Sequence, residues 1–128
     1  VQGHLDLRRV TTQPGLSAWQ GDPVRGGTLD RCLAGTVTPL AWSPLGGGRI
    51  GRSDDPVVTV LDRLAARHEV DTTAIALAFV MAHPSAPVPI LGTQRADRIL
   101  AARQALEVHL DRSEWYELYQ AGTGEPLP

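Results

Sequence analysis

The chain of 128 residues contains no lysine, so all twelve of its basic residues are arginine. Without a lysine amine, these residues cannot form a Schiff base with a carbonyl substrate or hold a nucleotide phosphate through a Walker-type lysine. A genome rich in G and C would produce the same arginine bias. Bidentate recognition of phosphate or carboxylate by arginine remains possible. The lack of lysine therefore excludes several enzyme classes and leaves anion binding open.

Cysteine and long apolar runs are also scarce. Cys32 is the only cysteine, which excludes an internal disulfide and is typical of a reducing compartment. No apolar run approaches the ~20 residues of a membrane span, and no signal peptide is visible. The net charge is −2 and the arginines are scattered. We therefore expect a cytoplasmic protein with no membrane or nucleic-acid partner, and the histidine spacing predicts no metal site.

The hydrophobic pattern alternates between strands and helices. Strands are expected at residues 10–13, 38–42 and 88–91, the last of them buried. Helices are expected after caps at Thr28, Asp55 and Asp71, over residues 95–106, and after a capping box formed by Asp111 and Glu114. The first of these helices should stop at Gly35, and the last should fray from residue 121. The apolar faces of the two middle helices are predicted to be Val58, Leu61, Leu64 and Ala65, and Ile75, Ala76, Phe79 and Ala82.

Strands separated by helices pair in parallel, so the sequence predicts an α/β fold with about three parallel strands. Such a sheet would leave both of its edges unpaired. A complete (β/α)8 TIM barrel needs about 250 residues. We therefore expect the chain to be the C-terminal part of such a barrel.

The first motif with chemical content is LAWSPLGGG at residues 40–48, where a short strand ends in glycines. The Trp42 ring could stack on a flat heteroaromatic group, and Ser43 could donate its hydroxyl. Leu45, Gly46 and Gly47 could present backbone N–H groups to a pyrophosphate, because glycine allows close approach. The alternative is a turn in which Trp42 only fills the core.

The second motif is PVPILGTQRADR at residues 87–98. Gly92 and Thr93 close a strand, and Arg95 and Arg98 follow three residues apart on one face of the next helix. Two guanidinium groups suit a phosphate dianion. The alternative is a solvated surface on which Arg98 pairs with Asp97 or Glu107.

Together the two motifs resemble the C-terminal part of an aldo/keto reductase, from about Thr11 to the C-terminus. The resemblance implies a (β/α)8 barrel that binds NADPH and reduces aldehydes or ketones. It places Trp42 on the nicotinamide, Gln13 on the carboxamide, and Thr93 and Arg98 on the 2′-phosphate. The cofactor-binding residues are thus predicted to be Gln13, Trp42, Ser43, Leu45, Gly46, Gly47, Gly92, Thr93, Arg95 and Arg98.

The sequence departs from the family pattern at three places. Ala101 and Ala102 replace the polar residues that contact adenine in the family, and Pro14-Gly15 replaces an acidic pattern after Gln13. The catalytic Asp, Tyr, Lys and His of the family come from earlier strands, so no catalytic residue is predicted in this chain.

Residues 1–128 are accordingly predicted to be one partial barrel that binds the cofactor. Its partners would be the remainder of the barrel and a small carbonyl substrate. Whether the isolated chain is an enzyme stays open at this point. Two alternatives also stay open: a non-catalytic dinucleotide- or phosphate-binding module, and a TIM-barrel enzyme acting on a phosphorylated substrate.

Overall fold

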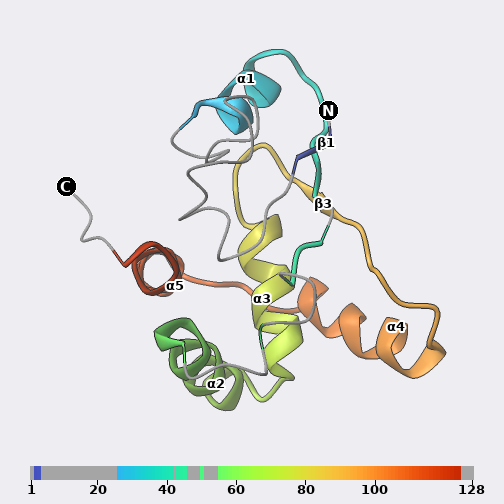
Figure 1. Cartoon of the computed structure of the whole chain (residues 1–128), viewed down its shortest axis with the longest axis vertical. Coiled ribbons are helices and arrows are strands. Elements are labelled where there is room, and N and C mark those ends of the chain that lie inside the picture. Colours follow the sequence, from blue (N-terminus) through green and yellow to red (C-terminus); the bar gives the residue numbers. More distant parts are fainter. Residues whose placement is uncertain (1, 4–25, 42, 46–49, 51–54, 125–128) are drawn as a thin grey trace.

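The structure is a computed structural model that describes residues 2–3, 26–41, 43–45, 50 and 55–124 (Figure 1). Three two-residue strands alternate with helices, as expected for an α/β fold. The strands are β1 (Gln2–Gly3), β2 (Leu40–Ala41) and β3 (Val88–Pro89). The helices are α1 (Thr28–Ala34), α2 (Pro56–His68), α3 (Thr72–Met81), α4 (Ala96–Ala102), the 3-10 helix η2 (Arg103–Leu106) and α5 (Arg112–Thr123).

The three strands form a parallel sheet in the order β1-β2-β3. Leu40 is in register with Gln2 on one side and with Val88 on the other. The Ile90 N–H donates to the Ala41 carbonyl oxygen at 2.7 Å, which extends the ladder beyond β3. The parallel pairing of the predicted strands at residues 38–42 and 88–91 is confirmed. Strand β1 was not predicted, and the strand expected at residues 10–13 lies outside the described residues.

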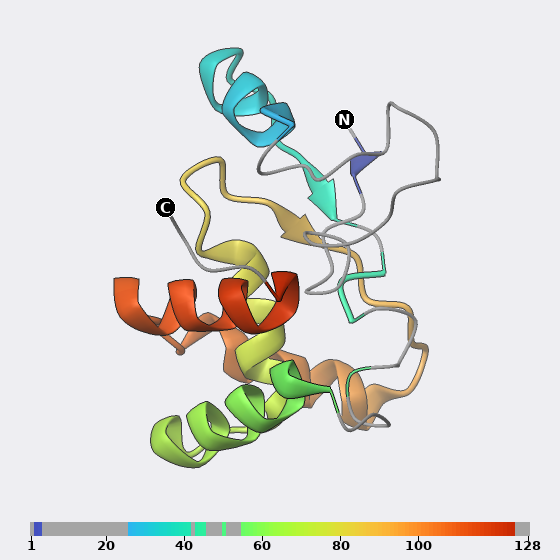
Figure 2. The same ribbon diagram turned by 60° about the vertical axis from the view of Figure 1, so that its left-hand side comes forward.

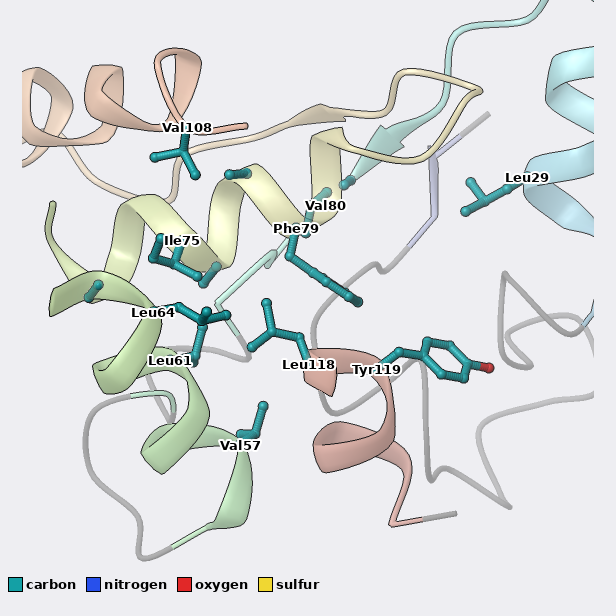
Figure 3. Packing of buried hydrophobic residues seen from close by; sticks show 14 residues of the cluster. Leu29, Val57, Leu61, Leu64, Ile75, Phe79, Val80, Val108, Leu118 and Tyr119 are labelled. Carbon is teal, nitrogen blue, oxygen red and sulfur yellow. The ribbon is translucent and has the colours of Figure 1, made fainter. Parts of the chain in front are cut away.

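Helices α2, α3 and α5 build the main core (Figures 2 and 3). Helix α3 is apolar on every side and is buried over residues 74–80, as a helix in the middle of a core must be. Two predicted facing residues are corrected. Val57, which was not predicted, is fully buried because it stands four residues before Leu61 on the inward stripe, while the predicted Val58 is half-buried and packs against the core. Ala82 is exposed, because α3 ends at Met81.

Local capping explains most helix boundaries. The Asp55 carboxylate accepts the Val57 N–H at 3.2 Å, with Pro56 in the first helical position, and Asp71 accepts the Thr73 N–H at 2.7 Å. Both predicted caps are confirmed, and Gly35 ends α1 as expected.

Two helix ends differ from prediction. Gly27, with φ 69°, occupies the cap position of α1, and Thr28 is the first helical residue. Helix α5 does not fray at residue 121 but continues to Thr123. It stops at Gly124, whose φ of 67° is one that glycine adopts without a steric penalty.

The prediction of a buried strand at residues 88–91 is wrong. Val88 is 47% exposed and Ile90 is 40% exposed, because β3 is an edge strand of the described sheet. Helix α4 has no buried residue, and Leu100 and Leu106 are 62% and 68% exposed. Exposed apolar side chains therefore occur on β3, α4 and η2 in the described part of the chain.

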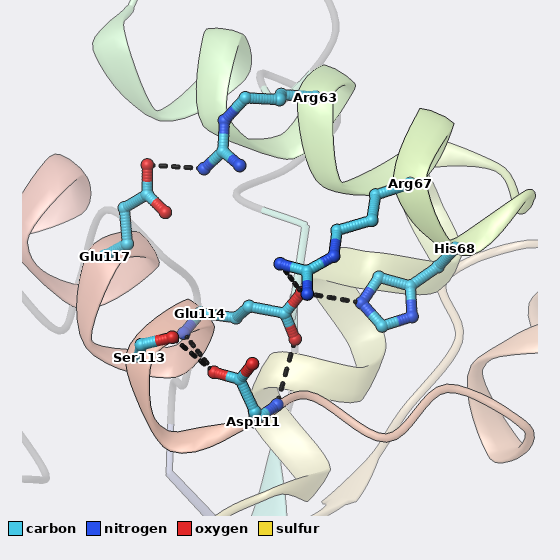
Figure 4. Close-up of polar contacts among 7 residues, drawn as sticks. All are labelled: Arg63, Arg67, His68, Asp111, Ser113, Glu114 and Glu117. Carbon is cyan, nitrogen blue, oxygen red and sulfur yellow. Dashed lines mark hydrogen bonds and ion pairs between the residues drawn. The ribbon is translucent and has the colours of Figure 1, made fainter.

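A buried carboxylate joins α2 to α5 (Figure 4). The Glu114 side chain is 4% exposed, forms an ion pair with Arg67 at 3.1 Å and is hydrogen-bonded to His68 Nε2 at 2.9 Å. It also accepts the Asp111 N–H at 2.9 Å, while Asp111 accepts the Glu114 N–H at 2.9 Å. This reciprocal pair confirms the predicted capping box. The Glu114 side chain thus binds a backbone N–H at the start of α5 and also holds α2 against α5.

Glu114→Ala is expected to lower the free energy of unfolding by about 2 kcal/mol, because it removes two hydrogen bonds and an ion pair made by a buried carboxylate. The matched control is Glu117→Ala, since Glu117 forms a half-exposed ion pair with Arg63. The control should lose less than about 1 kcal/mol. Urea unfolding of both variants measures the difference. Equal losses would contradict the structural role of Glu114.

The cap at Asp111 makes the stability of α5 depend on pH. Hydrogen bonds from the Ser113 hydroxyl and the Glu114 N–H hold the pKa of Asp111 below its usual value. Its stabilising effect is therefore complete above the unfolded pKa and is lost as pH falls through the lower folded pKa. Melting curves should show that Asp111→Ala differs most from the parent chain at neutral pH. The difference should begin to shrink below about pH 4 and vanish only below the lowered folded pKa of Asp111. A gap that widens in acid would contradict this assignment.

Candidate functional site

Because β2 and β3 are parallel, the two chain segments that follow them leave the sheet at the same side, the carboxyl ends of the strands. Ala41 is in register with Pro89, and both strands run in the same direction. Residues 43–45 follow β2, and residues 90–95 follow β3 (Figures 1 and 2). Leu45 and Leu91 also pack against one cluster formed by Ala74, Leu77 and Ala105. The described parts of the two predicted motifs therefore converge, as ligand sites of parallel sheets do at the carboxyl ends of strands.

The turn after β2 contains a strained backbone. Ser43 has a φ of 49°, a left-handed conformation that costs a non-glycine residue about 1–3 kcal/mol. The side chain of Ser43 is half-buried, and Pro44 beside it is buried. Such strain is typical of turns that position a functional group.

Four predicted site residues lie outside the described residues: Gln13, Trp42, Gly46 and Gly47. Their predicted contacts with the carboxamide, the nicotinamide and the pyrophosphate stay predictions.

The turn after β3 contains a glycine with open space beside its backbone and a threonine hydroxyl group. Gly92 is exposed, and a Cβ added to it would meet no protein atom within 4 Å. Thr93 is half-buried, and its Oγ1 accepts the Arg95 N–H at 3.2 Å. Because a hydroxyl also carries one proton, Thr93 can still donate to an anion while it holds the start of α4.

The two arginines of the second motif differ in their partners. Arg95 donates from Nε and Nη2 to the two carboxylate oxygens of Asp97, at 3.1 and 2.7 Å. The Arg98 side chain has no hydrogen bond or ion pair with any residue that the structure describes. The alternative in which Arg98 pairs with Asp97 or Glu107 is therefore not what the structure shows.

Sequence reasoning missed the role of Asp97. It named Asp97 only as a partner of Arg98, whereas the structure pairs it with Arg95. Hydrogen bonds from the Arg95 side chain, and then from backbone N–H groups, hold the pKa of Asp97 below its usual value. Asp97 is therefore ionised at neutral pH. The signal in the sequence is that Arg95 and Asp97 are two residues apart at the start of a helix, with Arg95 at the cap position and Asp97 in the first turn.

A second polar cluster lies near the opposite edge of the sheet, before β3. His83 Nδ1 lies 2.9 Å from the Ser85 hydroxyl, and the Ser85 N–H points to the same nitrogen at 3.2 Å. Burial lowers the pKa of His83, against a smaller opposing effect of the Asp30 charge. These contacts close the turn between α3 and β3, so this cluster serves the fold.

Within the described ranges, no helix has the length and apolar character needed to cross a membrane. The same residues bring no three histidine, cysteine, aspartate or glutamate side chains together as a metal-binding set. The predicted cytoplasmic location stays a prediction.

Known proteins resemble this chain over most of its length. The sequence profile described as "Aldo/keto reductase family" matches residues 4–122. The chain is 42% identical to a 6-dehydroglucose reductase of Novosphingobium aromaticivorans over 97% of its own length and 42% of that protein's. It is 37% identical to a 6-dehydroglucose reductase of Agrobacterium fabrum, over 99% of the chain and 43% of the relative. The chain thus spans less than half the length of these relatives.

Solved structures agree with this likeness. A thermostable aldo-keto reductase, Tm1743, solved with the inhibitor epalrestat, matches with a TM-score of 0.65 and 29% identity, over 78% of this chain and 35% of that one. The aldo-keto reductase MGS-M4, from a deep-sea metagenome library, matches with a TM-score of 0.66 and 17% identity. That match covers 98% of this chain and 40% of that one, and at this identity it supports the fold alone. The described residues are therefore an α/β fragment that matches part of aldo-keto reductase structures.

Gly92→Ala tests whether the fold itself requires glycine in the second motif. Because a Cβ there meets no protein atom, the free energy of unfolding should change by less than about 0.5 kcal/mol. The control is Gly124→Ala, which places a side chain at a φ of 67° and should cost about 1 kcal/mol. Denaturant unfolding compares the two variants. A larger loss at Gly92 than at Gly124 would show that packing requires glycine at Gly92.

Proposed function

Because the chain belongs to the aldo/keto reductase family, we propose that it is the NADPH-binding, C-terminal portion of an oxidoreductase that reduces aldehydes or ketones by hydride transfer. The observation that carries the proposal is the convergence of the two motif segments at one edge of the sheet. An arginine without a protein partner in the described residues lies in the second of these segments. The chain spans 42% of the N. aromaticivorans relative, so we propose the reductase activity for a whole enzyme of which this chain is one part.

The second segment fits the 2′-phosphate of NADPH by its donors. Arg98 offers a guanidinium that forms no ion pair or hydrogen bond with a described side chain, and the Thr93 hydroxyl retains a proton to donate. A planar guanidinium binds a phosphate dianion in bidentate geometry. Gly92 leaves the backbone open to close approach. These three residues would therefore hold the phosphate that distinguishes NADPH from NADH.

The first segment would hold the pyrophosphate and the nicotinamide end. Ser43 and Leu45 lie in the turn after β2 and would offer a hydroxyl and a backbone N–H, together with Gly46 and Gly47. Trp42 would stack on the nicotinamide, and Gln13 would bind its carboxamide, as the family resemblance implies. The adenine would gain little from α4, because Ala101 carries no polar group and Ala102 packs against a core cluster.

When bound, NADPH supplies the hydride that reduces the carbonyl carbon. The residues of this chain would bind and orient the cofactor and would not transfer the proton. The lysine of the family's catalytic set cannot come from this chain, which has none. The proton donor would come from the remainder of the barrel. We propose that this remainder covers the apolar surface of Val88, Ile90, Leu100 and Leu106.

The substrate class follows from the relatives. Two proteins at 42% and 37% identity are 6-dehydroglucose reductases, whose names denote reduction of an oxidised sugar. We propose that the carbonyl substrate of the whole enzyme is likewise a small, polar, oxidised sugar. The residues that would contact it are not among those assigned above.

The test of the proposed function is Arg98→Ala in the 128-residue chain. Calorimetric titration should show that the variant binds NADPH about 10- to 100-fold more weakly, the cost of losing hydrogen bonds between charged groups. Binding of NADH, which lacks the 2′-phosphate, should change less than about twofold. Arg103→Ala removes an exposed arginine from η2 and should leave both affinities unchanged.

Three outcomes would contradict the proposal. Equal losses of affinity for NADPH and NADH would show that Arg98 does not bind the 2′-phosphate. Binding of a sugar phosphate without binding of either dinucleotide would favour a barrel enzyme with a phosphorylated substrate. The chain could also bind NADPH and yet show no activity after the N-terminal half of a relative is added. That outcome would favour a non-catalytic binding module.

A further inference from the structure

We propose that Asp97 is a specificity-determining residue of this site, because its carboxylate occupies Arg95 and so weakens the hold of the site on a phosphate dianion. The inference rests on the proposed function and deepens it. It concerns how strongly the chain prefers a dinucleotide with a 2′-phosphate over one without it.

The ion pair between Arg95 and Asp97 is the first observation. Both oxygens of Asp97 are engaged, at 3.1 Å from Nε and 2.7 Å from Nη2 of Arg95. This is the bidentate geometry that arginine would otherwise offer to a phosphate. Both side chains are well exposed to solvent. An exposed pair of this kind is weak enough to exchange with a competing anion.

The position of Arg95 relative to Arg98 is the second observation. Arg95 occupies the cap position of α4, and Arg98 is three residues further along. The same two positions in α5 are held by Asp111 and Glu114, whose side chains each bond the backbone of the other residue. Arg95 and Arg98 therefore lie about one turn apart at the start of α4. A released Arg95 would bring a second guanidinium to an anion held by Arg98.

The charge of Asp97 acts in the same direction. The carboxylate lies one residue from Arg98 and interacts electrostatically with its charge, so a phosphate held by Arg98 would be in the field of the same carboxylate. It repels such a phosphate in addition to engaging Arg95. In the present sequence, the Arg98 guanidinium can bind a phosphate, whereas the Arg95 guanidinium is bound to Asp97.

The experiment compares Asp97→Asn with the parent chain in titrations with NADPH, NADH and inorganic phosphate. Asp97→Asn should bind NADPH and inorganic phosphate about fivefold more tightly, the scale of an exposed ion pair. NADH affinity should change less than about twofold. Glu107→Gln removes one exposed carboxylate from the end of η2 without releasing Arg95, and should change none of the three affinities.

A double variant separates release of Arg95 from simple loss of charge. In an Arg95→Ala background, Asp97→Asn should tighten NADPH and phosphate binding much less than in the parent chain, because no guanidinium remains to be released and only the repulsion by the carboxylate is relieved. An equal gain in both backgrounds would overturn the proposal and leave only a general charge effect. The absence of any gain in the single variant would also overturn it.

The phosphate titration distinguishes failure of the inference from failure of the proposed function. If neither the parent nor the variant binds NADPH, and phosphate binding still tightens through Arg95, the cofactor assignment fails and the role of Asp97 stands. If NADPH binds and the variant shows no gain, the role of Asp97 fails and the cofactor assignment stands. Thermal melting of each variant confirms that the changes in affinity arise in folded protein.

Discussion

The rest of the structure depends on the parallel pairing of β2 with β3. Two backbone hydrogen bonds, from Val88 to Pro39 at 2.9 Å and from Ile90 to Ala41 at 2.7 Å, fix which residues leave the sheet together. Helices α2 and α3 lie between these strands in sequence and form the core with α5. The motif segments after both strands then pack through Leu45 and Leu91 on one cluster. A shift in this pairing would separate the two halves of the proposed nucleotide site.

The chain uses its charges in two different environments. Glu114 is buried and held by two hydrogen bonds and an ion pair, so these contacts stabilise the packing of α2 on α5 and cannot exchange without loss of stability. The pair of Arg95 with Asp97 is exposed and can exchange with a ligand at little cost. The first arrangement serves the fold. The second suits a site whose ligand is an anion.

Features set by short-range chemistry could be predicted from the sequence. The caps at Asp55 and Asp71 and the capping box of α5 follow from residue types at fixed spacing, and the structure confirms them. The burial of residues 88–91 was predicted wrongly, because burial depends on distant elements that cover a strand. The partner of Asp97 could not be chosen either, since Arg95 and Arg98 are both within reach and local geometry decides between them. The family resemblance of the two motifs was confirmed by the match to residues 4–122.

The central claim is that the segments after β2 and β3 form a single nucleotide site. The most direct measurement is an NMR titration of the isotopically labelled chain with NADPH, which follows backbone amides one by one. The account predicts that the amides of Ser43 and Leu45 shift together with those of Gly92, Thr93 and Arg98, with one common dissociation constant. Shifts confined to one segment, or two segments that saturate at different concentrations, would contradict it.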